Sequence, residues 1–272
     1  MGLTADETSR YYDPDAGSQW QRAADDLLTA LAGRSVGDPT EATSAIRGLS
    51  FYAWVSQDDD KRDRALDKAR ELADALIQSS AEDSVETSAA IWGLIQVGEI
   101  EGDARYSDRA VELFEVLRAD FDADHGVFNS IEAYTAHDVA WLMAGLSAMS
   151  QRGPDEHRGA ASKTLLAFFE SVMDQSGLQL SAPPGKNGAM AGEFEKNLPS
   201  VVYYHGAETP PPPAAGGEFG KAPVPASEIK WDGTNWTVTN DRFTTAWAMH
   251  LANELNWLVP HLGSVPFPAA RR

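Results

Sequence analysis

The chain has 272 residues, 43% of them hydrophobic, which is enough for one large domain or two small ones with a buried core that needs no metal or disulfide. Forty-one Asp and Glu against 22 Lys and Arg give a formal net charge of −19, which argues against nucleic acid and anionic membranes as partners. The absence of Cys excludes disulfides, thiol catalysis and thiolate metal sites, and no apolar run approaches the roughly 20 residues of a membrane helix.

The acidic residues are spread over nearly every polar segment rather than gathered in one. This distribution favours a hydrated acidic shell of the kind that suits a salty medium, where ions screen the repulsion. The competing interpretation is a docking surface for a basic partner, which would concentrate the charge. The N-terminus lacks a signal-peptide pattern, so two compartments remain open: the cytoplasm of a halophile, or export of a protein whose sequence is given without its signal.

Hydrophobic periodicity predicts helices of two alternating kinds. Helices with one polar face are expected at 18–32, 60–78, 107–121 and 155–174. Helices that are apolar nearly all round are expected at 40–56, 85–98, 136–151 and, last, 242–258. Capping patterns that begin at Ser18, Asp38, Asp83 and Thr135 mark helix starts, and Gly33 and Gly153 mark helix ends.

This alternation indicates stacked helical hairpins. The pattern over 18–174 and 242–258 resembles the α/α-toroid superfamily, which includes six-hairpin glycosidases and sugar epimerases. The resemblance implies an all-α, toroid-like array with the apolar helices inside and the polar-faced helices outside. Eight helices make about four hairpins, fewer than the six or more of the familiar enzymes, so a small or incomplete ring is expected. We predict a single domain over residues 1–272.

Residues 175–241 interrupt the helices because they are rich in Pro and Gly. Within them a short β-hairpin is expected, with strands at 228–231 and 236–238 and a turn at Asp232-Gly233. The segment is interpreted either as a flap across one face of the helices or as a brace between the last helix and the first. Residues 216–254, which include the hairpin and most of the last predicted helix, resemble the ending of uncharacterised prokaryotic proteins, many of them exported.

One acidic loop has the composition of a calcium site. Asp120, Asp122 and Asp124 alternate, Gly126 allows a sharp turn, and Glu132 follows. The spacing is one residue longer than in an EF-hand, and an acidic loop that simply leaves a helix would look the same. Calcium is the one cofactor that we consider; no other is expected.

Two short constellations are candidates for acid–base chemistry. His137 and Asp138 lie at the start of an apolar helix, although Asp138 also completes a helix cap after Thr135. On the last helix, His250 and Glu254 share one face, so Asp138 and Glu254 form the candidate carboxylate pair of a glycosidase-like site. Residues that could bind a ligand around them are Trp92, Trp141, Trp247, Asn253 and Trp257.

Three functions follow as hypotheses. The first is a non-catalytic binding or assembly module, whose toroid surface and flap engage a protein partner or a ligand. The second is a carbohydrate-active enzyme, a glycoside hydrolase or sugar isomerase, with the tryptophans stacked on sugar rings; core packing explains the tryptophans equally well. The third is a structural subunit of an exported redox assembly. Motifs of serine hydrolases, zinc peptidases, P-loop proteins and dinucleotide-binding proteins do not occur.

Overall fold

The structure is a computed structural model that describes residues 13–79, 81, 83–169, 171–172, 228–234 and 236–240, together with His250, Leu251 and Glu254. Its helices are α2 (Pro14–Ala32), α3 (Pro39–Val55), α4 (Asp59–Gln78), α5 (Ser84–Glu101), α6 (Ala104–Asp120), α7 (Ala136–Arg152) and α8 (Asp155–Phe169). The prediction of a mostly helical protein is confirmed. Residues 175–227 of the expected flap and most of the expected helix 242–258 lie outside the described residues.

Short polar side chains begin these helices. Asp38 accepts hydrogen bonds from the backbone N–H groups of Thr40 and Glu41, and Asp83 accepts one from Glu86. Thr135 and Asp138 form the predicted capping box. The predicted start at Ser18 is wrong: α2 begins four residues earlier, where Asp13 caps the helix and Pro14 occupies its first turn.

The three apolar helices α3, α5 and α7 form a row, in which α5 packs against α3 on one side and against α7 on the other. On one side of α5, the Thr43 hydroxyl donates to the carbonyl oxygen of Ala89 at 2.9 Å. On the other side, the Ser88 hydroxyl donates to the carbonyl oxygen of Trp141 at 3.0 Å. Eight residues further along α5, Gln96 accepts from Arg152 at 2.7 Å, so α5 and α7 advance together.

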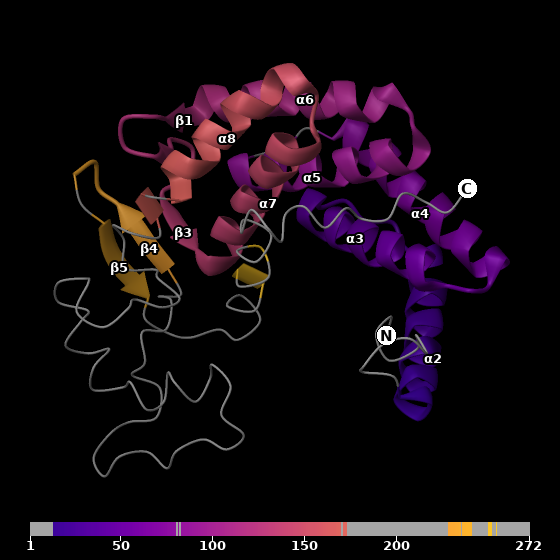
Figure 1. Cartoon of the computed structure of the whole chain (residues 1–272). Coiled ribbons are helices and arrows are strands. Elements are labelled where there is room, and N and C mark those ends of the chain that lie inside the picture. Colours follow the sequence, from indigo (N-terminus) through magenta and orange to yellow (C-terminus); the bar gives the residue numbers. More distant parts are fainter. Residues whose placement is uncertain are drawn as a thin grey trace, which may run out of the picture.

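The polar-faced helices α4, α6 and α8 lie on the outside of this row (Figure 1). Each packs against the apolar helix that precedes it in the chain. Neighbouring outer helices are also joined: the Tyr106 hydroxyl of α6 donates to Asp74 of α4 at 2.9 Å, and Phe114 of α6 meets the ring of His157 of α8 edge to face. The two predicted classes of helix therefore occupy an inner and an outer layer.

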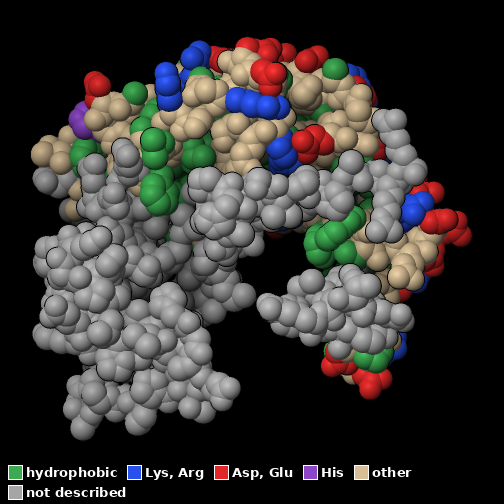
Figure 2. Space-filling model, viewed as in Figure 1, with side chains coloured by type: hydrophobic (Ala, Val, Ile, Leu, Met, Phe, Trp, Pro, Cys, Tyr) green, Lys and Arg blue, Asp and Glu red, His purple; other side chains and the backbone are tan. Residues whose placement is uncertain are grey.

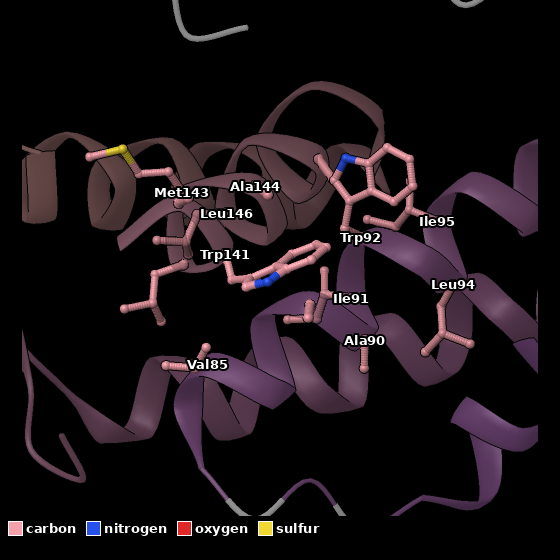
Figure 3. Packing of buried hydrophobic residues seen from close by; sticks show 14 of the residues in the cluster. Val85, Ala90, Ile91, Trp92, Leu94, Ile95, Trp141, Met143, Ala144 and Leu146 are labelled. Carbon is pink, nitrogen blue, oxygen red and sulfur yellow. The ribbon is translucent and has the colours of Figure 1, made fainter. Parts of the chain in front are cut away.

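The contact between α5 and α7 is close enough that glycine is required. A Cβ atom on Gly145 would lie 2.1 Å from the carbonyl oxygen of Ser88, far inside van der Waals contact. The missing side chain allows the two backbones to approach, and Trp92, Ile91 and Trp141 pack beside the contact (Figure 3). The centre of the molecule is thus made of helices buried on more than one side.

Two small sheets extend the helical body. Strand β1 (Phe121–Asp122) pairs with β2 (Val127–Phe128), and the order of the second sheet is β3 (Ala133–Thr135), β4 (Glu228–Trp231), β5 (Trp236–Asn240). The hairpin β4–β5 confirms the predicted one, with Gly233 of the turn at φ 96°. Strand β3, just before α7, was not predicted, and its pairing with β4 fixes the hairpin to the helical body.

One helix departs from this compact arrangement. Figure 1 shows α2 projecting from the row of hairpins, and of its described residues Gly17 and Leu28 are buried. The end of α3 is also open: Trp54 is 49% exposed, although it lies on a helix that we expected to be apolar and buried. Among the described helices, none combines the length and the hydrophobicity needed to cross a membrane.

Candidate functional site

A polar cluster lies where His250 and Glu254 meet α3 and α7, the two helices at the ends of the inner row. Arg47 of α3 forms a salt bridge with Glu254, and its Nη2 lies 3.3 Å from Glu254 Oε2. One turn before Glu254, the Nδ1 atoms of His250 and His137 are 3.3 Å apart. The cluster joins α3, α7 and residues 250–254, which are far apart in the sequence.

Two tryptophans form the wall beside this cluster. The Arg47 guanidinium carbon lies 4.3 Å from the ring centre of Trp92 and 5.5 Å from that of Trp141. Trp141 also donates to His137 Nε2 at 3.2 Å, and its ring meets that of His250 edge to face at 4.8 Å. The two tryptophans are 6% and 1% exposed. They were predicted as ligand-binding residues, and in the structure they enclose the arginine side chain.

Burial sets the charge state of the two histidines. Burial, the positive charge of Arg47 and the proximity of His137 lower the pKa of His250 to about 4. Burial likewise lowers the pKa of His137. Both rings are therefore neutral at neutral pH, and the Glu254 carboxylate, 3% exposed, has the guanidinium of Arg47 as its charged partner.

The two carboxylates of the candidate acid–base pair have different environments. Asp138 Oδ2 accepts hydrogen bonds from the N–H and the hydroxyl group of Thr135, both at 2.8 Å. Glu254 is paired with Arg47. Each carboxylate therefore has a structural role, one as a helix cap and the other as a link between chain segments. Their action on a substrate remains a prediction.

The remaining predicted binding residues, Trp247, Asn253 and Trp257, lie outside the described residues. The residue that the sequence analysis missed is Arg47. Its signal was present, because it is the single charged residue between Glu41 and the end of the apolar helix α3. A cation there requires a buried anion, and Glu254 is the acidic residue that the last predicted helix offers.

The acidic loop predicted to bind calcium is the β1–β2 hairpin. Asp120 accepts hydrogen bonds from the hydroxyl groups of Ser84 and Ser130, both at 2.6 Å. Asp122 accepts from the N–H of Asp124 and pairs with the His125 ring at 2.7 Å, and this pairing raises the pKa of His125. Glu132 pairs with Lys230 of β4.

These carboxylates are spread along the hairpin rather than gathered. In the parts of the chain that the structure describes, no group of three or more His, Asp or Glu side chains could hold a metal ion. Gly126 has a packing role, because its φ is +69° and a Cβ there would lie 2.6 Å from the carbonyl oxygen of Ala167. Calcium binding remains a prediction; a calcium-dependent rise in melting temperature of chelator-treated protein would support it, and no rise would contradict it.

Comparison with known proteins gives no family assignment: no family model matches the chain, and no curated protein or solved structure is significantly similar to it.

Proposed function

We propose that the last helix closes the inner row of helices into a small α/α toroid. Two contacts support this closure. His250 lies against His137 and Trp141 of α7, while Glu254 is bound to Arg47 of α3. Since α3 and α7 stand at opposite ends of the row α3–α5–α7, a helix that touches both would complete a ring of four inner helices.

The function that we propose is that of a non-catalytic binding or assembly module. The observation that carries this proposal is the pairing of Arg47 with Glu254 in the polar cluster. Glu254 neutralises Arg47, and the guanidinium is covered by Trp92 and Trp141. A centre in which Glu254 pairs with Arg47 and the tryptophans cover the guanidinium holds the ring together and leaves the outer surface for recognition.

The exposed hydrophobic side chains support α2 as the recognition element. Of the six large hydrophobic side chains that are exposed in the described part of the chain, four belong to α2 and α3. On α2, Trp20 is 59% and Leu27 is 64% exposed, and at a spacing of seven residues they lie on one face. Figure 2 shows a hydrophobic patch over α3 on the visible face. We infer a protein partner with an apolar groove and a basic rim, which suits the net charge of −19.

The test is affinity capture from the cells of origin with the tagged full chain. We expect a bound protein that is lost with Trp20→Gln/Leu27→Gln and retained with Val116→Gln/Leu166→Gln. The second pair is a matched control, because Val116 and Leu166 are 61% and 57% exposed but lie on the outer helices α6 and α8. The same proteins bound by all three chains, or none bound by the wild type, would contradict the proposal.

A carbohydrate-active enzyme is the second candidate function, and the observation in its favour is the carboxylate of Glu254 near two tryptophans. A panel of glycosides tests it. Turnover by the wild-type chain that is lost in Asp138→Asn and Glu254→Gln would establish the enzyme and overturn the binding module. Because Asp138→Asn weakens a helix cap, circular dichroism of both variants must show that they are folded.

A further inference from the structure

The described C-terminal residues indicate the direction of the chain along α3. His250 contacts the first two turns of α7, at His137 and Trp141, whereas Glu254 contacts the third turn of α3, at Arg47. Across α5, Thr43 of α3 and Trp141 of α7 lie at the same level, since they form hydrogen bonds with the adjacent α5 residues Ala89 and Ser88. Arg47 lies about one turn beyond Thr43 along α3. The chain from 250 to 254 therefore runs in the same direction as α3, toward its C-terminal half.

That half of α3 presents an uncovered hydrophobic face. Arg47, Ser50, Phe51 and Trp54 follow at intervals of three, one and three residues and lie on one side of the helix. Phe51 is 40% and Trp54 is 49% exposed, and their rings pack edge to face at 5.2 Å. Ser50 is buried, and its hydroxyl group lacks a hydrogen-bond partner. Two exposed aromatic rings that pack on each other form a hydrophobic face that a further segment can cover.

The sequence that follows Glu254 has the chemistry of such a cover. Residues 255–267 read LNWLVPHLGSVPF, with large apolar side chains throughout and no acidic residue. Two arginines follow at 271 and 272, and Asp58, Asp59 and Asp60 stand just beyond the end of α3. The apolar side chains of the segment thus match the aromatic face of α3, and the two arginines match the three aspartates. The segment also follows directly after Glu254, which is already bound to α3.

We propose that the α3 face formed by Ser50, Phe51 and Trp54 is the docking site of residues 255–267 of the same chain. The inference rests on the closure proposed above, because Glu254 delivers the segment to α3. Since α3 and the segment run in the same direction, Leu258, four residues after Glu254, is expected to lie against Phe51, four residues after Arg47. The bound segment covers this α3 face and leaves the exposed face of α2 open to a partner.

Disulfide trapping in the full chain tests the proposal, because the natural sequence contains no Cys. The test variant is Phe51→Cys/Leu258→Cys, and the matched control is Val116→Cys/Leu258→Cys, whose first position is exposed on α6. Under mild oxidation we expect loss of both thiols in the test variant, an intramolecular 51–258 linkage by mass spectrometry, and free thiols in the control.

Two outcomes would overturn the proposal. A disulfide-linked dimer of the test variant would assign the α3 face to a second copy of the chain. Free thiols in a test variant whose circular dichroism matches the wild type would show that this segment does not lie on the α3 face. Failure of the closure itself is distinguishable, since energetic coupling between Arg47 and Glu254 is measured separately in a double-mutant cycle.

Discussion

Helices α5 and α2 are similar in length but opposite in environment. Thirteen of the 18 residues of α5 are buried, whereas Gly17 and Leu28 are the buried residues among the 19 of α2. The sequence of α5 is apolar all round and that of α2 is one-sided. An apolar helix must be surrounded by its own protein, whereas a one-sided helix can present part of its stripe to another molecule.

The largest expected effect comes from filling the contact between α5 and α7. Gly145→Ala places a methyl group against the Ser88 carbonyl, and neither backbone can move without disturbing the core. We expect a loss of about 3 kcal/mol in the free energy of unfolding, measured by urea denaturation. Gly159→Ala on α8 is the control, since a Cβ there meets no atom within 4 Å; it should leave stability unchanged or raise it.

The buried ion pair gives the next largest effect. Arg47→Met removes the guanidinium that pairs with the buried Glu254 carboxylate, and we expect a loss of about 2 kcal/mol, because Arg47 itself is partly exposed. Arg47→Met/Glu254→Gln should lose less than the sum of the two single variants. Additive losses would show that the two residues are not coupled and would remove the support for ring closure.

Acid should destabilise the folded protein through the polar cluster around His250. In the unfolded chain His250 has a pKa of about 6.5, whereas its folded pKa is about 4. Between these values the unfolded state binds more protons, so stability is fully present above pH 6.5 and falls as the pH decreases toward 4. The expected loss by pH 5 is about 2 kcal/mol. His250→Gln should flatten this slope in chemical denaturation; an unchanged slope would contradict the burial of a neutral ring.

The smallest effect concerns the surface rather than the core. Acidic side chains lie over the outer helices on the visible face (Figure 2). If repulsion among them opposes folding, raising KCl from about 0.1 M to about 1 M should increase the melting temperature by about 3 °C. NaCl should act equally, because screening depends on ionic strength. A decrease in both salts would contradict the proposed adaptation to a salty medium.

Local signals in the sequence predicted most of the helices. Asp38, Asp83 and Thr135 begin helices as expected, because a cap is a contact between residues two or three apart. Ser18 was misread, since the Asp13-Pro14 pair upstream supplies a better start. Strand β3 escaped prediction because its three residues gain their partner from β4, almost a hundred residues later.

The candidate site was predicted only in part, because some of its contacts join residues that are far apart in the sequence. His137, His250 and Glu254 were selected from their positions on apolar helices, and the structure brings them together around Arg47 and the two tryptophans. The role of Asp138 as a cap was also readable, because it depends on Thr135 three residues before it. The pairing of Glu254 with Arg47 was not, because the two residues are 207 positions apart.

The sequence by itself determined the alternation of helix types, the caps and the β4–β5 hairpin, all of which depend on neighbours within a few residues. The tertiary structure alone decided that Gly145 lies against Ser88, that Arg47 meets Glu254, and that Trp20 of α2 and Trp54 of α3 remain exposed. Periodicity specifies which side of a helix is apolar, but which surface covers that side depends on packing between segments that are distant in the chain.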